Sequence, residues 1–176
     1  MYSYILENKL KRMYKRKSRE RHFLNWKDIH TILVLFDTSH FDEVAVFMKQ
    51  LKKLGKKVTV YAYQKKEDQR NYSNTNYRII LEKEVGRWFG NPLRTIIHEL
   101  QKETFDAVID LTLNRNIYLE YLLAHIPASV KTGLKKTNSP QYDLAITTLF
   151  TGEAESYQVQ ELGKQIVYYL DRIGTG

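Results

Sequence analysis

The chain has 176 residues, of which 43% are hydrophobic and 12% aromatic, with a formal net charge of +8 and no cysteine. This composition predicts one globular domain and excludes a disordered or collagen-like chain, and the lack of cysteine excludes disulfides, thiolate metal sites and thiol catalysis. No apolar run approaches the roughly 20 residues of a membrane helix, and the lysine-rich start lacks the apolar core of a secretory signal, so we expect a cytoplasmic protein without a membrane span.

The positive charge is concentrated in residues 1–28, which we interpret as a basic N-terminal arm in front of a single domain over residues 29–176. Nine basic and three acidic residues lie in the arm, whereas the rest of the chain carries 19 basic and 17 acidic residues. Apolar residues recur in the arm at spacings of one, three and four, which predicts an amphipathic helix of about 15 to 20 residues. Its apolar positions are Tyr2, Ile5, Leu6, Leu10, Met13 and Tyr14.

The basic residues of this arm have two interpretations. Clusters of Lys and Arg bind phosphate groups through counterion release, without sequence readout, so the arm is a candidate contact for RNA or a ribonucleoprotein, for another protein partner, or for anionic lipid. Alternatively, the helix docks on the domain by its apolar stripe and its charges are only solvated. The candidate partner-binding residues are Lys9, Lys11, Arg12, Lys15, Arg16, Lys17 and Arg19.

Strands and helices alternate after the arm. The β-branched apolar run over residues 30–36 predicts a strand buried on both faces. A helix is predicted over residues 41–54, with Ser39 and Asp42 as a capping pair at its start. Residues 56–63 predict a second strand, so that strand, helix and strand form a βαβ unit with parallel strands.

The later segments continue this alternation. A polar loop leads from residues 56–63 to a short strand at 77–81, and the sequence leaves open whether these two strands are parallel or antiparallel. The other predicted elements are a helix at 92–103 with Asn91 as its N-cap, helices at 117–124 and 154–173, and strands at 105–113, 130–134 and 144–148. The pattern predicts a three-layer, Rossmann-like α/β domain with a mostly parallel sheet.

Part of the chain resembles a known family. The residues that carry the resemblance are Ile109, Asp110, Leu111, Ala124, Ala128 and Gly133, with the turn Trp88-Phe89-Gly90 and the strand entry Tyr142-Asp143-Leu144. This pattern resembles the N-terminal Rossmann-like half of heptosyltransferase-type (GT-B) glycosyltransferases, and residues 30–172 resemble a family of small bacterial proteins of unknown function. In such enzymes the second domain mainly builds the nucleotide-sugar site, so the resemblance implies that a lone half needs a partner chain for glycosyl transfer.

Ligands of open α/β sheets bind beyond the carboxyl ends of the strands, where the strand order reverses. If the first and fourth strands are neighbours, Asp37 and Arg115 flank one cleft. A helix N-terminus and a guanidinium there are suited to a small phosphate or carboxylate, whereas the structural alternative assigns the same residues to caps and to the surface. The candidate ligand-binding residues are Asp37, Thr38, Ser39, Asn114, Arg115 and Thr147.

Several motifs of catalysis and cofactor binding are missing from the sequence. Neither G-x-G-x-x-G nor G-x-x-x-x-G-K-[ST] follows the first strand, and no G-x-S-x-G occurs, which argues against dinucleotide, P-loop and serine-hydrolase chemistry. No two of the five histidines have the i,i+4 spacing of a helical metal pair. We therefore expect a binding domain without catalytic residues, cofactor or metal. The alternative is a small-anion-binding or vestigial glycosyltransferase-like domain that uses the cleft near Asp37 and Arg115.

Overall fold

The computed structural model describes residues 2–16, 23–87, 90–147 and 158–173. Its centre is a six-stranded sheet of order β3-β2-β1-β4-β5-β6, in which every neighbouring pair is parallel. The strands are β1 (Thr31–Asp37), β2 (Lys57–Gln64), β3 (Arg78–Leu81), β4 (Phe105–Asp110), β5 (Ala128–Leu134) and β6 (Leu144–Ile146). The predicted Rossmann-like fold is thus confirmed, and the strand order reverses between β1 and β4.

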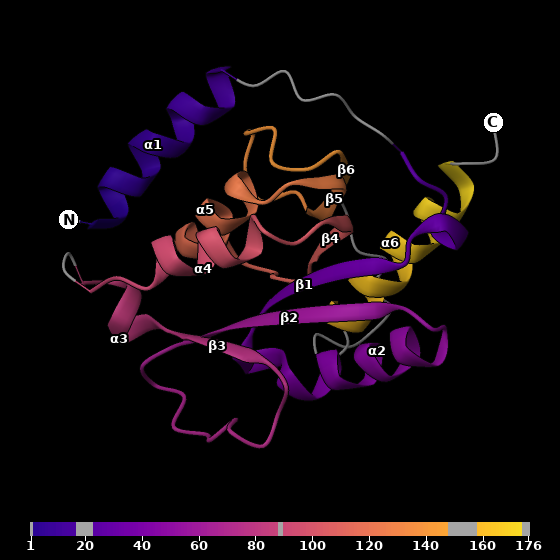
Figure 1. Cartoon of the computed structure of the whole chain (residues 1–176), viewed down its shortest axis with the longest axis horizontal. Helices are drawn as coiled ribbons and strands as arrows, with labels where there is room; N and C mark the ends of the chain where they lie inside the picture. Colours follow the sequence, from indigo (N-terminus) through magenta and orange to yellow (C-terminus); the bar gives the residue numbers. More distant parts are fainter. Residues whose placement is uncertain (1, 17–22, 88–89, 148–157, 174–176) are drawn as a thin grey trace.

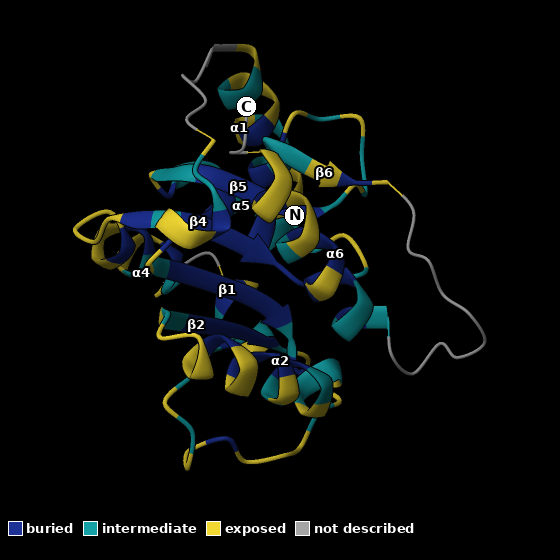
Figure 2. Cartoon of the chain, turned by 90° about the vertical axis from the view of Figure 1, so that its right-hand side faces the viewer, coloured by how far each residue is buried: buried dark blue, intermediate teal, exposed yellow. Residues whose placement is uncertain are grey.

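Helices cover both faces of the sheet and give the fold three layers (Figure 1). One face carries α2 (Phe41–Lys53), α6 (Gln158–Ile173) and the 3-10 turn Trp26–Asp28, and the other carries α1 (Tyr2–Arg16), α3 (Glu82–Val85), α4 (Leu93–Leu100) and α5 (Ile117–His125). Side chains of β1 alternate between the layers: Val34 packs toward α2 and α6, whereas Leu33 and Leu35 pack toward α4 and α5. All three are fully buried, because the central strand of a covered parallel sheet has no exposed face (Figure 2).

The connection between β2 and β3 resolves the question that the sequence left open. These strands pair in parallel, with Tyr61 opposite Arg78 and Gln64 opposite Leu81. The chain crosses from one to the other through residues 65–77, which form no helix. This irregular crossover places a polar loop at the carboxyl ends of β1 and β2.

Within the basic arm, Tyr2–Arg16 form an amphipathic helix, α1. In α1 the side chains of Leu6 and Leu10 are 0% and 1% exposed, and Leu6 belongs to the core cluster of α4 and α5. The arm is therefore docked on the domain by its apolar stripe and lies beside α5 (Figure 1). None of the described helices is long and apolar enough to cross a membrane.

Several predicted boundaries are wrong by a few residues. β4 ends at Asp110 instead of 113, because the Asp110 carboxylate accepts the backbone N–H of Thr112 at 2.9 Å and turns the chain out of the sheet. α4 ends at Leu100, and the segment 101–104 continues as turns. The predicted start of the last helix at 154 lies outside the described residues.

Candidate functional site

The carboxyl end of β1 is shaped by Asp37, which caps a 3-10 turn before α2. Its Oδ1 accepts hydrogen bonds from the Ser39 backbone N–H at 3.0 Å and from the Ser39 hydroxyl at 2.8 Å. Its Oδ2 lies 3.5 Å from Nζ of Lys65. The predicted capping pair of Ser39 and Asp42 is wrong: α2 begins without a side-chain cap, because the preceding turn already carries its own cap in Asp37.

Behind this turn, the Asp68 carboxylate of the β2–β3 crossover accepts hydrogen bonds from three residues. Its Oδ2 accepts the hydroxyls of Thr38 at 2.7 Å and Tyr72 at 2.6 Å, and its Oδ1 accepts Nε of Arg70 at 3.1 Å. Burial alone would raise the pKa of Asp68, but the hydrogen bonds from Arg70, Tyr72 and Thr38 outweigh it and hold this pKa below its ordinary value. The Arg70 guanidinium also donates to the Thr38 carbonyl at 2.7 Å, so the crossover is tied to the end of β1.

Because the pKa of Asp68 is lowered in the folded protein, the free energy of unfolding is expected to depend on pH. Its contribution is fully present above about pH 4, the ordinary value of an unfolded aspartate, and is lost as the pH falls through the lower folded pKa. We expect Asp68→Asn to lower the free energy of unfolding by about 1 to 3 kcal/mol at pH 7 and by less at pH 3. Urea denaturation at both pH values tests this, with the exposed Glu67→Gln as control. An equal loss at both pH values would contradict it.

A cavity of about 360 Å³ opens between β1, β2 and the crossover. Its lining residues are Asp37, Thr38, Ser39, Lys65, Glu67, Asp68 and Arg70. Each of its cations is paired with an acid of the same cavity, Lys65 with Asp37 and Arg70 with Asp68. Arg115, which the sequence analysis placed across a cleft from Asp37, does not line this cavity.

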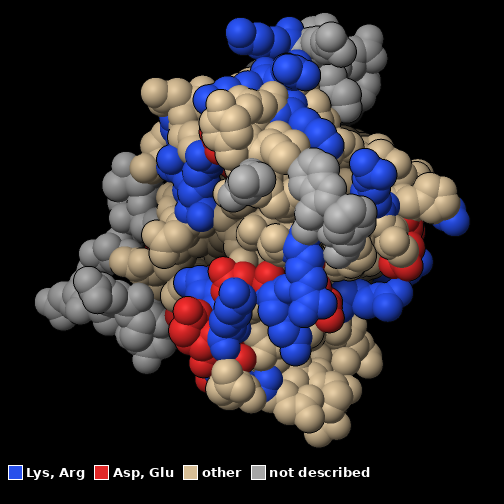
Figure 3. All heavy atoms as spheres, turned by 90° about the vertical axis from the view of Figure 1, so that its left-hand side faces the viewer, with Lys and Arg blue, Asp and Glu red and all other residues tan. Residues whose placement is uncertain are grey.

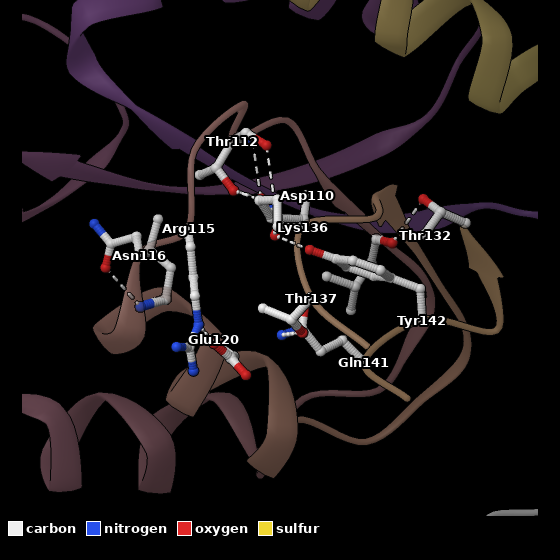
Figure 4. A network of polar contacts seen from close by, with 12 residues as sticks. Asp110, Thr112, Arg115, Asn116, Glu120, Thr132, Lys136, Thr137, Gln141 and Tyr142 are labelled. Carbon is white, nitrogen blue, oxygen red and sulfur yellow. Dashed lines mark hydrogen bonds and ion pairs between the residues drawn. The ribbon is translucent and has the colours of Figure 1, made fainter. Parts of the chain in front are cut away.

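The end of β4 carries a buried polar network centred on Asp110 (Figure 4). Its Oδ1 accepts the Thr112 backbone N–H at 2.9 Å and the Thr112 hydroxyl at 2.6 Å, and its Oδ2 accepts the Tyr142 hydroxyl at 2.6 Å and Nζ of Lys136 at 3.1 Å. Nζ of Lys136 also donates to the carbonyl and hydroxyl oxygens of Thr112 at 2.9 and 2.7 Å. The side chains of Asp110 and Lys136 are 4% and 8% exposed. Every polar atom of this ion pair therefore already has a partner.

Tyr142 closes this network from the loop between β5 and β6. A Cβ at Gly133 on β5 would lie 2.6 Å from Cε1 of the Tyr142 ring, so only glycine leaves room for the ring. Burial, followed by the charge and the hydrogen bond of Asp110, raises the pKa of Tyr142 far above its ordinary value and keeps its hydroxyl a donor. Asp110, Gly133 and Tyr142, three residues of the sequence resemblance, thus meet in one structural cluster.

Arg115 joins α1 to α5. Its Nη2 lies 2.9 Å from Oε2 of Glu7, and its Nε donates to Oε2 of the buried Glu120 at 2.8 Å. The Tyr14 hydroxyl donates to the other oxygen of Glu120 at 3.4 Å, and burial together with the Glu120 charge raises the pKa of Tyr14. The guanidinium predicted to bind a ligand is thus engaged by two carboxylates of the protein itself.

The other predicted ligand residues are scattered along the carboxyl edge of the sheet. β1 and β4 are neighbours, as the predicted cleft requires. Thr38 is fully buried, whereas Asn114 and Thr147 are exposed, and their side chains make no hydrogen bond with the described part of the chain. The structure therefore brings Asp37, Thr38 and Ser39 together and leaves the remaining candidates apart from that group.

Of the predicted partner-binding residues, Lys11, Arg12 and Lys15 lie on the outer face of α1, and Lys9 lies on the side of α1 that is near the beginning of α4. The side chains of Lys9, Lys11, Arg12 and Lys15 are exposed. Arg16 is the last residue of the helix, and Lys17 and Arg19 lie outside the described residues. No ion pair or hydrogen bond joins the four exposed side chains to residues that the structure describes. Tyr4, 70% exposed, lies on the same face.

The charges of the carboxyl edge and of α1 are thus arranged differently. At the carboxyl edge, Lys65, Arg70, Arg115 and Lys136 each pair with a carboxylate. Figure 3 shows basic side chains directly beside acidic ones on the lower half of the visible face, and basic side chains with few acidic neighbours toward its top. On α1, by contrast, the exposed side chains of Lys11, Arg12 and Lys15 have no acidic partner in the described part of the chain.

The strand order, its reversal between β1 and β4 and the covering helices define a Rossmann-like α/β domain. The chain belongs to a family of unknown function, DUF6913, whose model matches residues 3–173 and so includes α1. Among solved structures it is similar to E. coli heptosyltransferase WaaC with ADP, with a TM-score of 0.52 and 16% identity over 77% of this chain and 47% of that one. The chain spans about half the length of that protein, and the likeness shows the shared fold. A comparison with curated proteins finds no match.

The sequence analysis named several of the charged residues at the carboxyl edge of the sheet, but it did not identify the residues that pair with them. Glu120 lies within the apolar helix segment Ile117–His125, and a lone acid in such a segment is a signal for a buried ion pair. Lys136 and Asp68 lie in polar loops, and no local sequence pattern indicates that they are buried or that they bind residues of other segments.

Proposed function

We propose that the protein is a non-catalytic binding domain that contacts RNA, alone or within a ribonucleoprotein, through the phosphate backbone and without sequence readout. The observation that carries the proposal is the outer face of α1, where Lys11, Arg12 and Lys15 are exposed and have no acidic partner among the described residues. Such cations release counterions from a nucleic acid on binding, which is the main source of non-specific affinity.

The docking of α1 supports this role, because it presents the cations on a fixed frame. Leu6 and Leu10 are buried, and Glu7 ties the helix to Arg115. A helix that is already ordered loses less conformational entropy on binding than a free arm does. The sequence analysis treated docking of the helix and contact with phosphate as alternatives, but one helix can do both.

The same packing favours RNA over an anionic membrane. A helix that lies in a bilayer interface inserts its apolar face among the lipids. In α1 the apolar residues Leu6 and Leu10 are already buried against the domain, and the outer face offers charges and a single aromatic side chain, Tyr4. An RNA partner implies a cytoplasmic location, in keeping with a chain that has no cysteine.

The proposal is tested by removing the charges of α1. We expect Lys11→Gln, Arg12→Gln and Lys15→Gln together to weaken binding of a labelled RNA about tenfold or more at low salt. The slope of log affinity against log salt should fall by about 2, at roughly 0.7 per lost contact on a single strand. Fluorescence anisotropy at about 50 and 200 mM salt measures both.

A matched control removes the same charge elsewhere. Lys49, Lys52 and Lys53 are exposed on α2, on the opposite face of the sheet. Their joint replacement by Gln should leave affinity and salt slope near those of the unmodified protein. Equal losses from both triple variants would mean that only the net charge matters, and no binding by the unmodified protein would refute the proposal.

A second candidate function is the binding of a small anion in the cavity beside Asp37. It is favoured by the presence of Lys65 and Arg70 in that cavity and by the fold shared with a heptosyltransferase. An anion that binds there has to displace the Asp37 and Asp68 carboxylates from these cations. We therefore expect it to bind more weakly there than on the outer face of α1.

A further inference from the structure

A second cavity, of about 480 Å³, lies between α1 and the beginning of α4. It is lined by Tyr2, Ile5, Lys9, Gly90, Asn91, Arg94 and Thr95. One wall therefore comes from the arm and the other from the domain, so the cavity exists only while α1 is docked. Its volume is within the range of pockets that hold ligands of nucleotide size.

The charge of this cavity is unlike that of the one beside Asp37. The described residues that line it include two cations, Lys9 and Arg94, and no acid. Both side chains are exposed, and neither forms an ion pair or hydrogen bond with a described residue. The cations of the other cavity are neutralised in place by Asp37 and Asp68. Of these two cavities, only the one beneath α1 offers a net positive charge to a ligand.

The remaining lining suits the other half of a nucleotide. Tyr2 and Ile5 provide an aromatic and an aliphatic surface, both partly buried, against which a base can pack. Tyr2 and Arg94 line the same cavity, and the pKa of Tyr2 is raised by burial and lowered in part by the positive charge of Arg94. The amide of Asn91 is already bonded to the Val85 carbonyl at 2.7 Å and to the Leu93 N–H at 2.9 Å. The anion contacts therefore fall to the two cationic side chains.

We infer that this cavity binds the phosphate group of a nucleotide between Lys9 and Arg94, with the base against Tyr2 and Ile5. The nucleotide is either the end of an RNA strand that runs over α1, in which case the inference rests on the proposed function, or a free mononucleotide. Arg94 can hold two phosphate oxygens at once through its planar guanidinium, and Lys9 adds a point charge from the opposite wall.

The test places a negative charge in the cavity without disturbing the fold. Thr95 is exposed in the first turn of α4, where a glutamate is favoured by the helix dipole, so Thr95→Glu should fold normally. Thr95→Gln is the neutral variant of the same size. The probes are AMP and inorganic phosphate, followed by titration calorimetry, and one labelled RNA with a 5′-phosphate or a 5′-hydroxyl, followed by anisotropy.

We expect Thr95→Glu to bind the phosphorylated ligand at least tenfold more weakly than Thr95→Gln, the comparison that isolates the added negative charge from the change in size. Loss confined to the 5′-phosphorylated RNA identifies a strand end, and loss for AMP identifies a free nucleotide. If Thr95→Glu changes neither while the α1 charges still control RNA binding, the inference is overturned and the proposed function stands. Binding of AMP without any binding of RNA would uphold the inference and overturn the proposed function.

Discussion

Replacement of Asp110 by alanine is expected to lower the free energy of unfolding by about 3 to 5 kcal/mol, a large part of the 5 to 15 kcal/mol typical of a domain. The reason is that Lys136, only 8% exposed, then lies in the interior without its carboxylate partner. The hydroxyls of Thr112 and Tyr142 lose their acceptor at the same time. Urea denaturation followed by circular dichroism measures the loss.

The control removes both charges of this ion pair. Asp110→Ala with Lys136→Met leaves no unpaired ion in the interior, and we expect it to recover a good part of the stability lost in the single variant. Tyr142→Phe removes one hydrogen bond and should cost only about 1 kcal/mol. A double variant as unstable as Asp110→Ala would show that the cost arises from packing instead of the unpaired Lys136.

The second large effect is expected from Leu6→Ala combined with Leu10→Ala, which should release α1 from the domain. Truncation of a fully buried leucine to alanine typically lowers the free energy of unfolding by about 2 to 5 kcal/mol. The polar contacts that remain, Glu7 with Arg115 and Tyr14 with Glu120, are partly exposed and too weak to hold the helix. Hydrogen exchange should show loss of protection in the amides of α1 while those of β1 and β4 keep theirs.

Tyr4→Ala combined with Lys11→Ala is the matched control, because it truncates two exposed residues of the same helix. Alanine is the best helix former, so this variant should keep the protection of α1. Uniform loss of protection across the sheet in the leucine variant would instead mean that α1 is part of the cooperative core. The leucine variant should also lose the nucleotide site beneath α1, since Lys9 leaves with the helix.

The predictable part of the fold is the part encoded by local patterns. The buried strand β1 follows from its run of β-branched residues. The side chain of Asn91, the predicted N-cap, accepts the Leu93 N–H at 2.9 Å, but α4 begins one residue later than predicted and has Pro92 at its N-cap position. The direction of β3 relative to β2 could not be predicted from a local pattern. It depends on how the crossover packs, including the hydrogen bond between Asp68 and Tyr72, and the periodicity of apolar residues carries no information on this packing.

The candidate site was less predictable, because its contacts join residues far apart in the chain. Asp110 meets Lys136 across 26 residues and Tyr142 across 32. Arg115 was expected to face a ligand, but its guanidinium meets Glu7 of the arm. The sequence shows that a basic residue follows a strand. Only the folded structure shows whether a carboxylate of the protein already pairs with that residue. On α1, Lys9, Lys11, Arg12 and Lys15 have no acidic partner among the residues that the structure describes.

The docking of the arm on α5 also has a consequence for synthesis on the ribosome. α1 is made about 100 residues before α5, the helix against which it packs. At roughly 5 to 20 residues per second, its apolar stripe waits roughly 5 to 20 s for a partner. During this interval an amphipathic, lysine-rich helix is exposed close to ribosomal RNA and to chaperones. Docking of α1 therefore has to wait until α5 has been made, and a chain that stops before α5 leaves the apolar side of α1 uncovered.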